Sequence, residues 1–163
     1  MFHGAGVVLG PWAGDDDAVA DWNQQIIDEF RANGGTVETN GFGRGLVLVH
    51  HLGAKTGQER VSPVANIRQP DGSRLVAASK GGAPDNPAWY HNLLAHPEVT
   101  AEVGHPARAA RTMAVRAVEI TGPERDELYD RVVAVNPGFA DYARKTEGIR
   151  TIPLIALDPR PGD

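Results

Sequence analysis

The first clear pattern of apolar positions along the chain predicts a helix. From about residue 18, apolar side chains recur three and four positions apart and form one stripe, made of Val19, Trp22, Ile26, Ile27 and Phe30. Three aspartates at positions 15–17 offer an N-cap and suit the helix dipole, and the glycine pair at 34–35 is a stop signal. We therefore expect one amphipathic helix before residue 34.

Beyond residue 45 the pattern changes to short, β-branched apolar runs that are typical of strands. These runs cover residues 46–52, 60–67, 74–79, 99–103, 108–118 and 152–157. Tight turns join the first three into an antiparallel meander, in which Pro63 marks a bulge or an edge because it cannot donate a ladder hydrogen bond. Helices are expected at 87–95 and 123–134, with a further helical turn at 139–145. This content predicts a mainly β fold with flanking helices, a small closed or split β-barrel.

Length and composition indicate one domain. The 163 residues are 41% hydrophobic, enough for one core, and we place the domain at 17–163 after a Gly-rich flexible leader at 1–16. No apolar run approaches the roughly 20 residues that span a bilayer, and no secretory signal is evident, so we expect a cytoplasmic protein. Apolar residues of the leader leave open a weak association with the inner face of the membrane. The absence of cysteine excludes disulfides, thiolate zinc sites and Fe–S clusters.

The charge distribution points to a specific anionic ligand. The formal net charge of −5 argues against nucleic acid as a partner. Residues 44–80, however, hold six basic and two acidic residues, a net charge of +4, whereas the rest of the chain carries −9. A polyanion would meet repulsion from most of this protein, so a small anionic molecule suits the basic segment better.

Three short motifs could contact such a ligand. The turn Gly53-Ala-Lys-Thr-Gly-Gln-Glu-Arg60 combines two glycines with two cations and a hydroxyl, although it also reads as an ordinary polar hairpin turn. It is not a Walker A loop, because no glycine precedes Lys55 directly and a strand follows. Ser79-Lys-Gly-Gly82 follows a strand, and the meander would bring Lys80 near Arg60. Residues 89–92 open a short helix, where one face packs on the barrel and the other faces a ligand.

The chain shows no evident catalytic group of its own. His50 and His51 are neighbours in a strand and face opposite sides, so they cannot share a metal ion. His91 and His96 have poor metal spacing, and we expect surface or packing roles for all four histidines and no metal site. No Ser or Lys has an evident activating base. A bound cofactor would therefore have to supply the reactivity.

Several motifs in order resemble the deazaflavin (coenzyme F420)-dependent nitroreductase family of actinobacteria. The resemblance runs from about Trp22 to Pro159. Besides the motifs above it includes Ser62-Pro63, Pro87-Ala-Trp-Tyr-His-Asn-Leu93, Asn136-Pro-Gly-Phe-Ala-Asp-Tyr142 and Ile152-Pro-Leu. It implies a split β-barrel related to flavin-mononucleotide-binding reductases. It also implies that reduced F420 donates a hydride to a small-molecule acceptor: a quinone, an activated alkene or a nitro compound.

The resemblance assigns roles to individual residues. The cofactor's phosphate and oligoglutamate tail would be held by Lys55, Thr56, Gly57 and Arg60, with Ser79, Lys80 and Gly81 completing the polar wall. The deazaflavin ring would be lined by Ser62, Pro63, Val64, Ala77 and Ala78, and the site closed by Trp89, Tyr90 and Asn92. This assignment agrees with the basic segment, because F420 carries several negative charges.

One departure from the family concerns the acceptor. Three tyrosines of the nitroimidazole-activating relative correspond to Asn136, Phe139 and Tyr142, which we expect to line the substrate. Only Tyr142 keeps a hydroxyl, and it is the candidate catalytic proton donor, with solvent as the alternative. We therefore expect bicyclic nitroimidazoles to be reduced slowly or not at all. Two rival functions stay open on the same fold: a flavin-mononucleotide (FMN) enzyme and a non-catalytic F420-binding or carrier protein. The choice between monomer and dimer also stays open.

Overall fold

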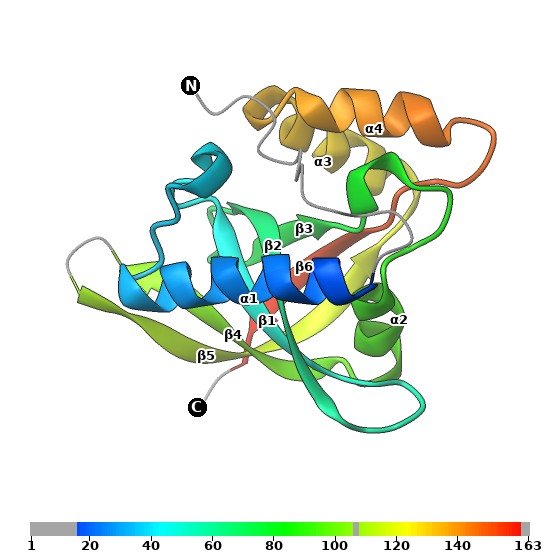
Figure 1. Cartoon of the computed structure of the whole chain (residues 1–163). Coiled ribbons are helices and arrows are strands. Elements are labelled where there is room, and N and C mark those ends of the chain that lie inside the picture. Colours follow the sequence, from blue (N-terminus) through cyan, green and yellow to red (C-terminus); the bar gives the residue numbers. More distant parts are fainter. Residues whose placement is uncertain (1–15, 106–107, 161–163) are drawn as a thin grey trace.

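A computed structural model describes residues 16–105 and 108–160 and shows a closed six-stranded antiparallel barrel (Figure 1). Its strands are β1 (Leu46–Leu52), β2 (Glu59–Arg68), β3 (Arg74–Ala77), β4 (Glu98–His105), β5 (Arg108–Ile120) and β6 (Leu154–Pro159). Around the barrel they follow the order β1-β2-β3-β6-β5-β4, and β4 pairs again with β1. Closure pairs every strand on two sides, so the barrel has no free edge strand. The predicted β-barrel fold is confirmed.

Helices cover the outside of the barrel. They are α1 (Asp16–Ala32), α2 (Ala88–Ala95), α3 (Gly122–Val135) and α4 (Gly138–Thr146), with short 3-10 turns η1 (Thr39–Gly41) and η2 (Lys80–Gly82). In Figure 1, α1 crosses the front of the barrel, α3 and α4 lie together above it, and α2 lies at its side. All predicted helices form, within a few residues of the expected bounds. The expected leader at 1–16 lies outside the described residues except for Asp16.

Strand β1 contributes side chains to two apolar layers, the barrel interior and the layer beneath α1. Because side chains alternate along a strand, Val47 and Val49 point into the barrel, whereas Leu46 and Leu48 pack beneath α1. The predicted stripe of α1 supplies the other side of that outer layer, with Ile26, Ile27 and Phe30 all buried. The side chain of Val19 lies outside the described set. A second outer layer packs α3 and α4 against β3 and β6.

Pro63 lies at a local edge of β2, as predicted. It pairs with Leu48 of β1, whereas β3 pairs with β2 only through Asn66–Arg68. The amide of Asn66 donates to Gly45 of the β1 side at 2.8 Å, so by alternation the nitrogen of Pro63 faces the side that β3 has already left. The missing N–H therefore removes no ladder hydrogen bond.

Two strands depart from their predicted bounds: the third is shorter, and the last is shifted toward the C-terminus. The third ends at Ala77, because the carbonyls of Ala78 and Ser79 accept hydrogen bonds from Arg150. The last begins at Leu154, after Pro153, which has no N–H to donate. Over the part of the chain that the structure describes, no helix combines the length and the apolar composition needed to cross a membrane.

Candidate functional site

The basic turn lies at the tip of the β1–β2 hairpin and is closed by its own backbone. The amide of Gly53 donates to the Gln58 carbonyl at 2.9 Å, and the amide of Gly57 donates to the Gly53 carbonyl at 2.8 Å. Gly57 has φ +69°, a left-handed conformation that favours glycine. A side chain at Gly53 would meet the Thr56 hydroxyl at 2.5 Å. Both glycines of the motif are thus explained by the shape of the turn.

The two cations of this turn are free to bind an anion. Lys55 and Arg60 are exposed, and within the described ranges neither forms an ion pair or hydrogen bond. Glu59, the acidic residue between them, already faces the His50 ring at 3.2 Å. Some cations elsewhere are paired, such as Arg31 with Glu102. The hairpin tip therefore carries uncompensated positive charge, which fits the anionic tail that the sequence predicted for this place.

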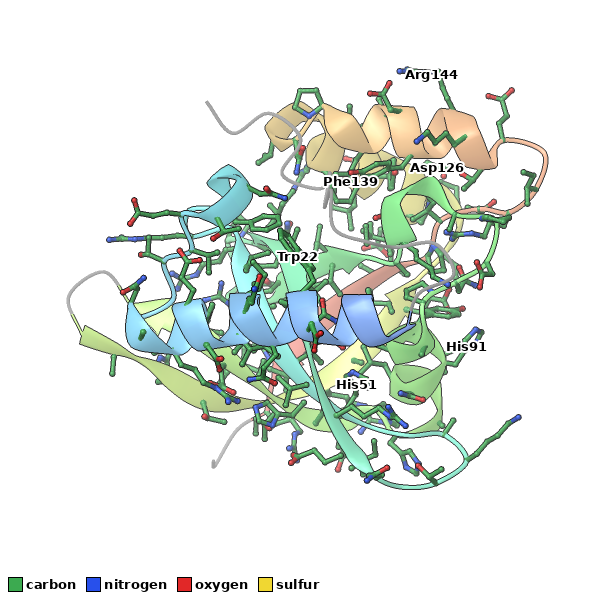
Figure 2. The ribbon with its side chains drawn as sticks, viewed as in Figure 1. Trp22, His51, His91, Asp126, Phe139 and Arg144 are labelled. Atoms are coloured by element: carbon green, nitrogen blue, oxygen red, sulfur yellow. The ribbon has the colours of Figure 1, made fainter. Side chains whose placement is uncertain are left out.

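A buried hydrogen-bond chain supports the turn from inside. His51 is 2% exposed, and its Nε2 lies 2.9 Å from the Ser62 hydroxyl while its Nδ1 lies 2.9 Å from Nδ2 of Asn92. Asn92, on α2, accepts the amide hydrogen of Ala54 through Oδ1 at 2.9 Å. Burial lowers the pKa of His51 to about 4, so the ring is neutral at pH 7. Figure 2 shows His51 near α2, whereas His91 points away from the barrel.

Two of the predicted ligand contacts on α2, Asn92 and Tyr90, have hydrogen-bond partners within the protein. Asn92 was expected to close the site against the ligand; the residue is 6% exposed, and its amide binds His51 and Ala54. Tyr90 was expected beside it, and its hydroxyl donates to the Glu119 carboxylate at 3.1 Å. Trp89 packs partly buried against the barrel interior, as the alternative interpretation proposed. Helix α2 therefore contacts the hairpin through Asn92 and the barrel interior through Trp89.

The predicted ring-lining residues divide between the two faces of the sheet. Val64 points into the barrel, as does Ser62 by alternation. Pro63 shares the outer face with Val61 and Ala65, and Ala77 packs in the layer beneath α3 and α4. Ala78 is fully buried. The structure therefore does not bring these five residues together on one surface.

The second basic turn is a separate feature. Lys80 binds Asp85 at 3.0 Å, and η2 packs against α4. Figure 1 shows η2 above α2 and the hairpin tip below it, so the expected approach of Lys80 to Arg60 does not form. The physical reason is that β3 pairs with β2 over three residues only and then diverges from it. Lys80 itself has φ +48°, a strained conformation for a residue with a side chain.

Arg150 holds this strained turn and was missed by sequence reasoning. Its guanidinium donates to the carbonyls of Ala78 at 3.2 Å, Ser79 at 2.9 Å and Ala83 at 3.1 Å, and to Oδ1 of Asn86 at 2.7 Å. Ser79 is buried, and Gly81 lies within the turn. Nothing in the local sequence around Arg150 indicates these partners, which lie 64 to 72 residues away.

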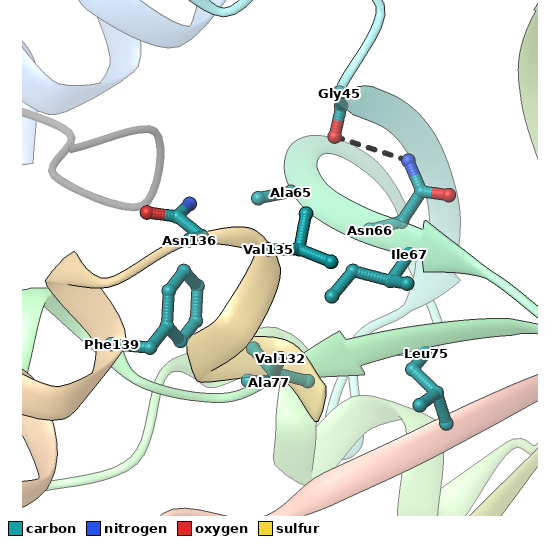
Figure 3. Close-up of a pocket in the computed structure, with 10 residues that line it drawn as sticks. All are labelled: Gly45, Ala65, Asn66, Ile67, Leu75, Ala77, Val132, Val135, Asn136 and Phe139. Carbon is teal, nitrogen blue, oxygen red and sulfur yellow. Dashed lines mark hydrogen bonds between the residues drawn. The ribbon is translucent and has the colours of Figure 1, made fainter. Parts of the chain in front are cut away.

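Two of the predicted substrate-lining residues border a cavity of about 70 Å³ between β2, β3 and α3 (Figure 3). Asn136 and Phe139 line it together with apolar side chains that include Ala65, Leu75 and Val132. Oδ1 of Asn136 is buried and has no partner among the described residues. The cavity therefore offers an apolar wall with one amide beside it. No group of three metal-binding side chains occurs in the described ranges.

Tyr142, the predicted proton donor, does not line this cavity. It is 3% exposed and packs edge-on against Phe139, with ring centroids 5.3 Å apart. Its hydroxyl is buried without a partner among the described residues, and burial raises the pKa of Tyr142 above its usual value. At neutral pH the phenol is therefore protonated and can only donate a hydrogen bond after a ligand or a rearrangement reaches it.

Comparison with known proteins agrees with this geometry. The family model of the F420H(2)-dependent quinone reductases matches residues 22–159. A curated F420H(2)-dependent quinone reductase of Mycobacterium tuberculosis is 37% identical over 115 residues, which cover 70% of this chain and 73% of that protein.

Two solved structures share the fold. One is described as an F420-H2 dependent reductase (33% identity, TM-score 0.61, 71% of this chain and 95% of that one). The other is described as a domain-swapped dimer (30% identity, TM-score 0.60, 86% and 99%). With the barrel, the unpaired cations of its hairpin tip and these matches in agreement, the chain belongs to the F420H(2)-dependent quinone reductase family and is an F420-dependent oxidoreductase.

Proposed function

We propose that this protein reduces a quinone, with the anionic tail of F420 held at the tip of the β1–β2 hairpin. The observation that carries the proposal is the pair of exposed cations, Lys55 and Arg60, which are unpaired within the described residues and lie on a turn that its own backbone closes. Charge-assisted hydrogen bonds from such groups suit phosphate and carboxylate oxygens. Thr56 and Gly57 are the other tail contacts on the same turn.

The bound reduced cofactor supplies the hydride, and the protein supplies binding and orientation. Lys55 and Arg60 fix the tail, which sets where the remainder of the cofactor lies against the barrel. Positioning of this kind lowers the barrier because the two reactants no longer have to find their relative orientation in solution.

The acceptor is proposed to lie beside Phe139 and Asn136. Both border the cavity under α3, whose other walls are apolar, and a flat, apolar quinone ring suits such a wall. The amide of Asn136 adds one polar group, whose buried Oδ1 still lacks a partner among the described residues. An acceptor that depends on phenolic donors has less to bind here, because Phe139 has no hydroxyl.

We expect menadione-like quinones to oxidise reduced F420 readily and bicyclic nitroimidazoles to do so slowly. Phe139→Tyr should raise nitroimidazole turnover, by up to about 10²-fold, because a positioned proton donor contributes that order of magnitude. Steady-state loss of reduced F420 measures both rates. Phe42→Tyr makes the same change in the buried layer under α1 and should leave acceptor choice unaltered. Efficient nitroimidazole reduction by the unmodified protein would contradict the role given to this position.

Tyr142 and Tyr129 offer a matched pair of phenylalanine variants. Tyr142→Phe removes a buried hydroxyl that has no partner in the described ranges, so we expect the free energy of unfolding to rise by about 1 kcal/mol. Tyr129→Phe removes a hydroxyl that donates to the Phe139 carbonyl at 2.8 Å, so the free energy of unfolding should fall by about 1–2 kcal/mol. Urea denaturation measures both.

The same variant tests the catalytic role of Tyr142. If the phenol donates the proton to the reduced acceptor, Tyr142→Phe should lower the turnover number by about 10²-fold without changing F420 affinity. A turnover number equal to that of the unmodified protein would mean that solvent supplies the proton.

A further inference from the structure

We infer that His51 is a positioning residue, which turns the hydroxyl of Ser62 into a hydrogen-bond donor for an oxygen atom of the cofactor and, through Asn92, holds the basic turn. The inference rests on the proposed function in one respect, because the cofactor must lie beside the hairpin. It concerns residues for which sequence reasoning expected either direct ligand contact (Ser62, Asn92) or simple packing (His51).

Hydrogen bonds link Ser62, His51, Asn92 and Ala54 in that order, and the backbone nitrogen of Ala54 at the end of the series sets the direction of each. The backbone nitrogen of Ala54 can only donate, so the side-chain atom of Asn92 that it meets at 2.9 Å must be the amide oxygen. The other end of that amide is then the NH₂ group, which donates to Nδ1 of His51 at 2.9 Å. Nδ1 must therefore carry no proton.

The other ring nitrogen of His51, Nε2, determines whether the Ser62 hydroxyl accepts or donates the hydrogen bond between them. A neutral imidazole has one N–H, so the proton lies on Nε2, which donates to the Ser62 hydroxyl oxygen at 2.9 Å. The hydroxyl accepts this bond and keeps its own hydrogen, for which the described residues provide no acceptor. Ser62 is partly exposed and lies two residues after Arg60 on β2. A ligand held at the hairpin can therefore receive the hydrogen on a carbonyl or phosphate oxygen.

The surroundings of His51 keep this arrangement fixed. Arg60 of β2 and His50 of its own strand both disfavour a positive charge on the ring, as does burial. Helix α2 presents the neutral amide of Asn92 to the ring. A second proton on Nδ1 would face the NH₂ group of Asn92, and turning that amide would set the NH₂ group against the amide of Ala54. The position of the proton on the His51 ring is thus coupled, through Asn92, to the hydrogen bond that holds the basic turn at Ala54.

The first test determines which ring nitrogen of His51 carries the proton, in the protein without cofactor. Nitrogen-15 NMR of the imidazole rings should show His51 as the Nε2–H form at pH 7. Asn92→Asp places a carboxylate oxygen against Nδ1, so His51 should gain a proton there and change to the Nδ1–H or the doubly protonated form. His50, which faces Glu59 and Glu102 on the other side of the strand, provides an internal reference. A His51 ring already protonated on Nδ1 in the unmodified protein would overturn the inference.

The second test measures F420 affinity by fluorescence titration. Ser62→Ala should weaken binding about 3- to 10-fold, the effect of one hydrogen bond, and Ser62→Thr should restore it because threonine keeps the hydroxyl. His51→Phe should weaken binding at least as much, and should add less than its full effect when Ser62 is already alanine. His50→Gln is the matched control and should bind F420 like the unmodified protein.

The outcomes separate the inference from the proposed function. Unchanged affinity in Ser62→Ala, with normal F420 binding by the unmodified protein, would overturn the inference and leave the proposed function standing. Failure of the unmodified protein to bind F420 would overturn both the proposed function and the donor role of Ser62.

Discussion

Replacing Lys55 or Arg60 by alanine should weaken F420 binding by about 10- to 100-fold for each residue. A charge-assisted hydrogen bond contributes about 1.5–3 kcal/mol, and neither cation has another partner within the described residues that could compensate. Both side chains are exposed, so the loss should shrink as salt is added, because ions screen exposed charges. Fluorescence titration with F420 at low and high ionic strength measures affinity and its salt dependence together.

Two controls make this result specific. Arg131→Ala removes an exposed cation from α3, away from the hairpin, and should leave F420 affinity unchanged. The same titration with FMN should show much weaker binding, because FMN lacks the oligoglutamate tail. Unchanged F420 affinity in folded Lys55→Ala and Arg60→Ala proteins would mean that these side chains are exposed to solvent on the turn and do not contact the cofactor. Equal affinity for FMN and F420 would contradict the place given to the tail.

The second large effect is expected at Arg150, in the stability of the protein. Arg150→Met keeps the apolar stem but removes a guanidinium that binds three carbonyls and the side chain of Asn86. The free energy of unfolding should fall by about 2–4 kcal/mol, because several half-buried acceptors lose their partner at once. Arg150→Lys should not restore it, since an ammonium group cannot reproduce the planar fork. Urea denaturation of each variant gives the values.

Arg144→Met provides the control for Arg150. Arg144 lies on the neighbouring helix α4, is exposed and pairs with Asp141 within the same helix. Such a surface pair contributes little, so the free energy of unfolding should change by less than about 0.5 kcal/mol. A similarly small change in Arg150→Met would show that the turn at Lys80 is held by other contacts.

Most of the fold was predictable because its signals are local. The stripe of α1 and the β-branched apolar run of β1 each depend on residues within one element. The hairpin tip was predictable for the same reason: its glycines and cations lie within eight residues of one another, and the turn closes on itself. The order of the motifs was sufficient to indicate the family.

The support of the site was not predictable in this way. His51 meets Asn92 across 41 residues, Asn92 meets Ala54 across 38, and Arg150 reaches Ala78 across 72. No periodicity links such positions, because their contact depends on strand register and on where α2 and α4 dock. The same reason separates Lys80 from Arg60, since the short pairing of β3 with β2 lets the chain turn away.

The sequence by itself thus determined the elements, the barrel, the family and the cations of the hairpin tip. Each of these follows from local conformational preference or from residue chemistry along a short stretch. The tertiary structure alone decided which polar groups are bound by distant parts of the chain. Asn92 and Tyr90 were available in the sequence for a contact with a ligand or with the protein. The structure buries Asn92 beside His51, where an unpaired polar group is costly, and it pairs the partly exposed Tyr90 with Glu119.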